Sequence, residues 1–270
     1  MGGHFCVSGR TRGQGYDRTR PSPNVRTLLA IIACIELFLV ASLGWVAVVI
    51  VYLPTFLFDK KRILSGRTLR RVAQAAATFS PMWSFRIHGE IPKSPGKAVC
   101  VSNHCSHTDV FLISHVPWEM KWLAKRSLFN LPFIGWSMRL VKDVPIDRAS
   151  PSAAKAALDK CAQWLAQDMP VMIFPEGTRS KTGEMQAFKD GAFRLAIDTG
   201  ADVLPMAVAG TDGALSKHDW RPGYARGILA IGKAISTAGM THKDVPRLKE
   251  EARAQIVAMR AEILPLSVAS

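Results

Sequence analysis

The sequence predicts an α/β fold in which helices flank a largely parallel sheet, with a membrane-embedded helical segment at the N-terminus. Two observations carry this prediction. From Trp83 onward, short apolar runs typical of strands alternate with segments typical of helices, and this alternation favours parallel strands joined by helical crossovers. Before that point, residues 28–58 are apolar over more than the roughly 20 residues needed to span a bilayer.

Composition limits the classes of partner. The 270 residues are 48% hydrophobic, which is enough for a sizeable core, and they carry a formal charge of +14. This excess indicates a polyanionic partner, whether nucleic acid, an anionic membrane surface or a phosphorylated substrate. The five cysteines are scattered without a CxxC pair, so we expect reduced thiols in a cytosolic setting.

The N-terminal third divides at changes in composition. Residues 1–26 are polar and Arg-rich and are predicted to form a disordered basic tail. Residues 27–80 are predicted to form a membrane-anchoring helical segment, and residues 81–270 the α/β domain. Basic residues flank the apolar run on both sides, which does not favour placing its ends across a membrane. Two interpretations stay open: a single span, or a segment that bends at Gly44 or Pro54 and returns to the same leaflet.

The elements of the α/β domain follow in order. Strands are expected at residues 84–88, 97–102, 120–124, 143–148, 171–174, 203–209 and 228–235. Helices are expected at residues 109–116, 127–140, 151–166, 188–199 and 244–263. Ser150 followed by Pro151 is an N-cap and first-position signal, and Gly200 is a helix stop.

A histidine and an aspartate lie five residues apart between the second strand and the first helix of this domain. Five residues correspond to about 140° on a helix, so His104 and Asp109 would not share a helical face. The pair can meet only across a bend that follows a strand near Ser102. A carboxylate on one imidazole nitrogen supports a histidine that acts as general base at the other nitrogen. Alone, this spacing is more typical of an ordinary loop histidine.

Polar residues also follow other strands. Glu176, Gly177, Thr178 and Arg179 form one turn after a predicted strand, and the glycine lets backbone approach a ligand closely. The carboxyl ends of parallel strands share one edge of a sheet, so this turn is expected near His104.

Two further cations end strands of their own. Arg148 follows one strand and can bind a phosphate through two hydrogen bonds, and Lys125 ends another. Each cation alone is more typical of a solvated surface. Cations at successive strand ends beside a His–Asp pair predict a phosphate-bearing acceptor held near a general base.

Four ordered motifs then carry a family resemblance. They are Asn103-His104 with Asp109, residues 144–148 (VPIDR), residues 174–179 (FPEGTR) and residues 203–208 (VLPMAV). Together they resemble the motifs of the glycerolipid acyltransferase family, and most closely its bacterial 1-acyl-glycerol-3-phosphate acyltransferase branch. The wider resemblance covers about residues 60–235. It implies acyl transfer from an acyl thioester to the sn-2 hydroxyl of lysophosphatidate, giving phosphatidic acid.

The resemblance also implies roles for particular residues. His104 would be the general base and Asp109 its orienting partner. Binding of the acceptor phosphate would fall to three cations, Lys125, Arg148 and Arg179. The acceptor site would be shaped by Asn103, Glu176, Gly177 and Thr178. Pro205 would border the acyl site.

The implied setting is the cytoplasmic face of the cell inner membrane. The donor would be acyl-carrier protein or coenzyme A in thioester linkage, and the anionic membrane surface would be a further partner. This chemistry needs no metal or other cofactor, and no cluster of His and Cys has ligand spacing.

Four alternatives stay open. Another lysolipid, such as a lyso-ornithine lipid, would keep the reaction but remove the need for Arg148. An acyl-enzyme on Cys105 would change the mechanism, although Cys105 is not a motif position. A membrane-tethered nucleic-acid-binding protein would suit the charge, but no nucleic-acid motif accompanies it, so we expect no nucleic acid as partner. A serine hydrolase ranks last because no GxSxG elbow is present.

Overall fold

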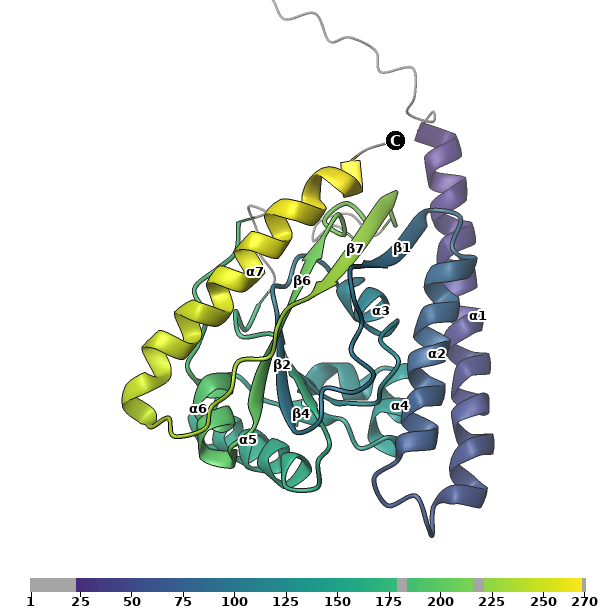
Figure 1. Cartoon of the computed structure of the whole chain (residues 1–270). Helices are drawn as coiled ribbons and strands as arrows, with labels where there is room; N and C mark the ends of the chain where they lie inside the picture. Colours follow the sequence, from purple (N-terminus) through teal and green to yellow (C-terminus); the bar gives the residue numbers. More distant parts are fainter. Residues whose placement is uncertain (1–22, 179–183, 216–220, 269–270) are drawn as a thin grey trace, which may run out of the picture.

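The chain forms one seven-stranded sheet between two layers of helices, with a pair of antiparallel helices at one end (Figure 1). The computed structural model describes residues 23–178, 184–215 and 221–268. The strands are β1 (Trp83–His88), β2 (Ala98–Ser102), β3 (Lys121–Lys125), β4 (Val144–Ile146), β5 (Val171–Ile173), β6 (Asp202–Ala209) and β7 (Ala225–Ile231). The helices are α1 (Pro23–Thr55), α2 (Ile63–Phe79), α3 (Asp109–Ile113), α4 (Ile134–Leu140), α5 (Pro151–Leu165), α6 (Gly191–Thr199) and α7 (Val245–Val268), with short 3-10 helices η1 (Arg126–Asn130) and η2 (His242–Asp244).

The sheet has the order β1-β7-β6-β2-β5-β3-β4. Its strands pair in parallel except at β6 and β7, so the predicted largely parallel sheet is confirmed. The central strand β2 is buried along its whole length, as expected for a parallel strand covered on both faces. One face packs against α3, and the other against α5, α6 and α7.

Several element boundaries differ from the sequence prediction. The last strand begins at Ala225 and ends at Ile231, and Ile235 forms only an isolated bridge to Val203. The first helix begins at Pro23, so residues 23–26 are helical and do not belong to the predicted tail. Residues 1–22 of that tail lie outside the described part of the chain.

The helix predicted at residues 127–140 is two elements. Its first part is η1, its second part is α4, and Leu131, Pro132 and Phe133 separate them. Proline disfavours helical backbone in the residue before it, and Leu131 is accordingly extended. Phe133 then has a φ of 59°, a conformation that non-glycine residues seldom adopt. The connection between η1 and α4 is therefore a turn.

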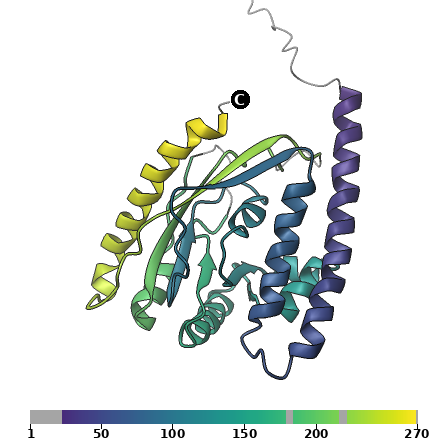
Figure 2. The ribbon, with the colours of Figure 1, turned by 45° about the vertical axis from the view of Figure 1, so that its right-hand side comes forward.

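The N-terminal apolar segment is one unbroken helix. Neither Gly44 nor Pro54 bends it, and the chain reverses only after Thr55, so that α2 runs back alongside α1 (Figure 2). The two helices are in close contact, because a Cβ on Gly44 would lie 2.2 Å from a methyl carbon of Val72. The part of α1 from Thr27 to Thr55 is long and apolar enough, by length and composition, to cross a membrane.

The turn between α1 and α2 is held by its own polar groups. Asp59 accepts hydrogen bonds from the backbone nitrogens of Ile63 and Leu64 at 2.9 and 2.8 Å, which satisfies donors at the start of α2. The Arg62 guanidinium lies 4.8 Å from the centroid of the Tyr52 ring, a cation–π contact. The helix pair is thus closed by defined contacts at the turn.

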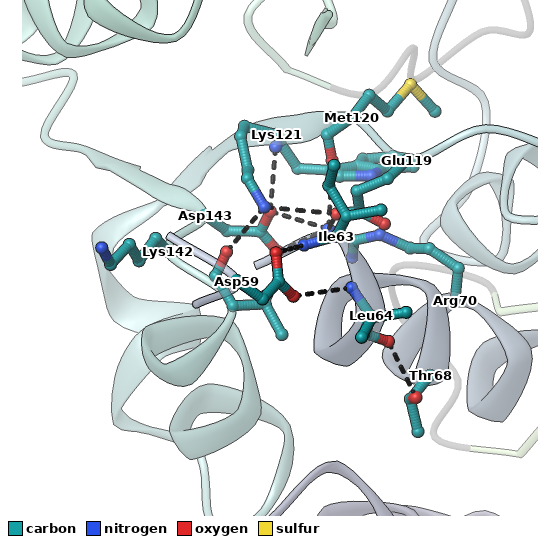
Figure 3. Close-up of polar contacts among 12 residues, drawn as sticks. Asp59, Ile63, Leu64, Thr68, Arg70, Glu119, Met120, Lys121, Lys142 and Asp143 are labelled. Atoms are coloured by element: carbon teal, nitrogen blue, oxygen red, sulfur yellow. Dashed lines mark hydrogen bonds and ion pairs between the residues drawn. The ribbon is translucent and has the colours of Figure 1, made fainter. Parts of the chain in front are cut away.

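A buried cluster of charged side chains joins α2 to the sheet (Figure 3). Arg70 contacts Asp143 at 2.7 Å and Glu119 at 3.6 Å, and all three side chains are at most 9% exposed. Lys121 is fully buried beside them and donates a hydrogen bond of 2.9 Å to the carbonyl of Val141. Burial raises the pKa of Glu119 and lowers that of Lys121. The helix pair and the α/β domain are therefore connected through groups shielded from water.

Candidate active site

His104 and Asp109 meet across the bend between β2 and α3. His104 lies two residues after the end of β2, and Asp109 is the first residue of α3. Nδ1 of His104 lies 2.8 Å from Oδ2 of Asp109. The Asp109 side chain is completely buried, whereas that of His104 is 13% exposed. The contact at Nδ1 leaves Nε2 as the nitrogen that can take a proton from a substrate.

Asp109 is held by four donors. Its Oδ2 also accepts hydrogen bonds from the backbone nitrogens of Cys105, at 2.7 Å, and Ser106, at 2.9 Å. Its Oδ1 accepts a bond of 2.6 Å from the hydroxyl of Thr211, which follows β6. These bonds satisfy a buried carboxylate and fix the atom that faces the imidazole.

Two further side chains of the motifs fix the loop that carries His104. Asn103 bridges to β6, because its Oδ1 accepts from the backbone nitrogen of Val208 at 2.8 Å and its Nδ2 donates to the Val208 carbonyl at 2.9 Å. Glu176 accepts from the backbone nitrogen of His104 at 2.8 Å and, through its other oxygen, from that of Gln186 at 2.9 Å. Burial raises the pKa of Glu176, and these two bonds oppose that effect. Both side chains therefore contact protein backbone and position the histidine.

Packing restricts the His104 ring further. The ring stacks on Phe174 with centroids 4.0 Å apart and an interplanar angle of 17°. Cys105 adjoins it, with Sγ 3.2 Å from Nδ2 of Asn103. Burial, and then the charge of Asp109, raises the pKa of the Cys105 thiol well above its ordinary range. The thiol is therefore protonated and poorly suited to act as a nucleophile.

A cavity of about 220 Å³ lies beside Phe174, on the side of the sheet covered by α5 and α6. Apolar side chains form most of its wall. Two cations also line it, Arg148 after β4 and Lys189 before α6. Arg148 donates a hydrogen bond to the carbonyl of Gly177, and a Cβ on Gly177 would lie 2.9 Å from Nζ of Lys189. Both cations thus converge on the glycine of the Glu176 turn.

The remaining predicted residues differ in where they lie in the fold and in whether they are exposed. Lys125 is exposed at the end of β3, next to β4, and Thr178 is exposed in the turn after Gly177. Pro205 is buried inside β6, in register with Val101 of β2, and is not part of the cavity wall among the described residues. Arg179 lies outside the described residues.

Sequence reasoning missed three residues of this centre, Phe174, Lys189 and Thr211. Phe174 is part of a motif, but nothing in the sequence indicates that its ring stacks on the histidine. Lys189 lies twelve residues beyond Gly177 in the chain, and Thr211 lies 102 residues beyond Asp109. The sequence offered only two signals for these residues: Lys189 follows a strand-end motif, and Thr211 follows an apolar strand. Lysine and threonine are both common at such positions in ordinary surface loops.

The fold and this centre together place a histidine against a buried carboxylate, an arrangement that suits the removal of a proton from a hydroxyl group. His104 follows the carboxyl end of β2 and Arg148 that of β4, at the edge where open α/β sheets bind ligands. Lys189 reaches this edge from just before the start of α6. Within the described ranges, no three His, Cys, Asp or Glu side chains gather as metal ligands would.

Comparison with known proteins identifies the family. Residues 84–209 match the Acyltransferase family. The 1-acyl-sn-glycerol-3-phosphate acyltransferase of Pseudomonas aeruginosa is 34% identical over 179 residues, which are 65% of this chain and 68% of that protein. The chain belongs to the acyltransferase family.

Other relatives carry the same name and are longer. The enzyme of Chlamydomonas reinhardtii is 34% identical over 80% of this chain and 66% of its own length. The chloroplastic enzyme of Arabidopsis thaliana is 32% identical over 72% of this chain and 56% of its own length. The chain thus spans somewhat more than half the length of these relatives. The solved 1-acyl-sn-glycerophosphate (LPA) acyltransferase PlsC of Thermotoga maritima shares the fold, with a TM-score of 0.69 over 87% of this chain and 97% of that chain, at 23% identity.

Proposed function

We propose that the chain transfers an acyl group from an acyl thioester to the sn-2 hydroxyl of 1-acyl-glycerol-3-phosphate and so forms phosphatidic acid. The contact between Nδ1 of His104 and Oδ2 of Asp109, 2.8 Å long and held by a buried carboxylate, carries the proposal. The names of the relatives supply the substrate.

The proposed step follows from that contact. Nε2 of His104 removes the hydroxyl proton as the hydroxyl oxygen bonds to the thioester carbonyl carbon. The carbon–sulfur bond then breaks, and the thiolate leaves and takes up that proton from the imidazolium. Asp109 supports the imidazolium charge between these two events. The donor thiol belongs to acyl-carrier protein or coenzyme A.

We assign the acceptor phosphate to the cations at Gly177. Arg148 and Lys189 line one cavity, and neither forms an ion pair with a carboxylate among the described residues. Burial lowers the pKa of Arg148, so an anion between the two cations would offset the cost of burying their charge. Lys125 on the neighbouring strand adds a charge nearby, and the assignment of Arg179 rests on the motif alone.

We propose that residues 27–80 anchor the α/β domain of residues 81–270 to the cytoplasmic face of the inner membrane, with α1 in one leaflet. A 33-residue helix is about 50 Å long, which exceeds the roughly 30 Å of a bilayer core. In the middle of α1, Phe38 contacts Phe133 just before α4, and Trp45 contacts Trp136 in α4. If α1 crossed the bilayer, α4 and the charged cluster behind it would lie within the hydrocarbon, so an orientation along the surface fits better.

Acyl transfer by the purified chain, with and without its base, tests the reaction. The wild type and His104→Ala would each receive a labelled acyl thioester with lysophosphatidate or with a phosphate-free lysolipid. We expect product from lysophosphatidate and a loss of about 10²–10⁴-fold in the variant. His88→Ala is the matched control, because His88 is an exposed histidine paired with Glu262. Product from the phosphate-free lipid alone would contradict lysophosphatidate as the acceptor. No product from either lipid would contradict the proposed acyl transfer.

A further inference from the structure

A small apolar ridge protrudes from the α/β domain beside α1. It consists of Leu131, Phe133, Ile134 and Trp136 in the turn between η1 and α4 and in the first turn of α4. Leu131 is 44% exposed, Ile134 44% and Trp136 43%. Three large apolar side chains exposed within six residues are costly in water, so this ridge requires a partner.

The ridge is continuous with the exposed face of α1. The ring of Phe133 lies 5.7 Å from that of Phe38 and 6.2 Å from that of Trp45, and Trp136 lies 5.5 Å from Trp45, all between centroids. Phe38 stays 61% exposed despite this contact. Phe38 therefore connects the exposed side of α1 to the edge of the ridge.

The outer face of α1 is apolar along its length. Residues spaced by three, four or seven share a side of a helix, and the exposed members of this side are Leu28, Ile35, Leu39, Leu43, Val46, Ile50 and Leu53. The opposite side of the helix carries buried residues, namely Ala30, Ala33 and Val48, and Ala33 belongs to an apolar cluster with Ala77 of α2. Phe38 and Trp45 lie between these two sides and contact the ridge. The ridge therefore extends the exposed apolar face of α1 to one side of the helix.

Exposed cations lie on the same elements as the ridge and on the residues next to them. Between Glu119 and Asp143 the sequence contains five basic residues and no acidic one. Lys121 is buried, whereas the other four, Lys125, Arg126, Arg139 and Lys142, are exposed around η1 and α4. Lysine and arginine next to an apolar surface are attracted to anionic lipid, and tryptophan favours the interface between hydrocarbon and headgroups. A lipid surface therefore fits the chemistry of the ridge and its surroundings.

We infer that the ridge of Leu131, Phe133, Ile134 and Trp136 is a second membrane contact, inserted into the same leaflet as α1. The inference rests on the proposed membrane association of α1. A single helix lying on a surface leaves the attached domain able to roll about the helix axis. A second contact beside the helix removes that rotation, so α1 and the ridge together fix how the carboxyl edge of the sheet faces the lipid.

Site-directed fluorescence on vesicles tests this inference. Single cysteines would be placed by Ile134→Cys on the ridge, Leu43→Cys on α1 and Ile91→Cys on the β1–β2 loop, in a chain whose Cys6 and Cys34 are serine. All three positions are exposed, at 44%, 68% and 43%, so labelling should not disturb packing. Each carries an environment-sensitive dye and is mixed with vesicles of phosphatidylcholine and phosphatidylglycerol containing a quencher on the acyl chain.

We expect the dyes at Ile134→Cys and Leu43→Cys to be quenched together and the dye at Ile91→Cys to stay in water. Quenching at Leu43→Cys alone would overturn the second contact and leave α1 as the anchor. An absence of quenching at both positions would overturn the membrane association as well. The readout is independent of acyl transfer, so failure of the proposed reaction would not alter it.

A charge substitution gives an independent measurement. Ile134→Asp should reduce binding to these vesicles at least several-fold, because it places a carboxylate in the anionic leaflet. Val257→Asp on α7 is the matched control, since Val257 is 44% exposed on a helix that packs on the other face of the sheet. Equal binding of both variants would contradict the inference.

Discussion

The hydroxyl of Thr211 donates a hydrogen bond of 2.6 Å to Oδ1 of Asp109, while the other oxygen of this carboxylate faces His104 at 2.8 Å. Thr211 is completely buried and lies two residues after the end of β6. The orientation of the His104 ring thus depends on β6, a strand that is distant in sequence from His104 and Asp109. Thr211 is a positioning residue in this arrangement, because it acts through Asp109.

Thr211→Val should lower kcat about tenfold and leave KM for the acceptor unchanged. The substitution keeps the shape of the side chain and removes one donor to a buried carboxylate, which costs about 1–3 kcal/mol. Steady-state kinetics with Thr211→Ser, which restores the donor, should recover most of kcat. Thr199→Val, whose hydroxyl bonds only within α6, is the control and should behave as wild type. A parallel rise in KM would contradict a pure positioning role.

Arg148→Ala and Lys189→Ala should each raise KM for lysophosphatidate, roughly tenfold or more for Arg148 because charged hydrogen bonds contribute about 1.5–3 kcal/mol. Both cations line the same cavity and meet at Gly177, so the two effects should be less than additive in the double variant. Lys155→Ala, an exposed lysine of α5 paired with Asp159, is the control. A fall in kcat with KM unchanged would argue against phosphate binding by either residue.

The sequence predicted the parallel core well for a physical reason. Strands such as β2 and β5 are short, apolar and bounded by turn residues, so their positions are encoded locally. The cap of α5 is equally local, because the Ser150 hydroxyl accepts from the backbone nitrogen of Ala153, as Ser150-Pro151 predicted. The meeting of His104 and Asp109 across a bend was also accessible, since helix and strand geometry exclude the alternatives.

The features that the sequence did not predict depend on tertiary contacts. The antiparallel pairing of β6 with β7 has no local signal, because strand direction is set by the long connection between them. Thr211 and Lys189 acquire their contacts only once β6 and α6 pack in place. The break at Leu131 was partly encoded by Pro132, but an apolar periodicity on both sides suggested one helix. Gly44 signalled a bend in the sequence, whereas in the fold it allows α2 to pack closely.

Cys105→Ser should retain most acyl transfer activity. Burial raises the pKa of the thiol, so an attacking thiolate does not form near neutral pH. Mass spectrometry after alkylation should show slow modification of Cys105 between about pH 7 and pH 9, a range where an ordinary thiol with a pKa near 8.5 ionises. Cys34, which is half-buried in α1, provides the comparison within the same sample. Loss of activity in Cys105→Ser with rapid alkylation of the wild type would restore the acyl-cysteine alternative.

Arg70→Met should destabilise the fold by about 3–5 kcal/mol, because Asp143 and Glu119 would lose their buried counter-charge. Arg71→Met changes the exposed neighbour on the same helix and should cost less than about 0.5 kcal/mol. Urea unfolding in detergent measures both. The double variant Arg70→Met with Asp143→Asn should be less destabilised than the sum of the single changes. Equal stability of Arg70→Met and Arg71→Met would show that the cluster contributes nothing to holding α2.

The burial of Arg70, Glu119, Lys121 and Asp143 has a consequence for ionic strength. Two formally positive and two formally negative groups are enclosed where dissolved ions cannot reach them, whereas mobile counterions screen exposed charges within about 10 Å at 0.1 M salt. The attraction of exposed lysines and arginines to any anionic partner will therefore weaken as the salt concentration rises, whereas the buried ion pairs between α2 and the sheet will not. Added salt should therefore leave α2 attached to the sheet.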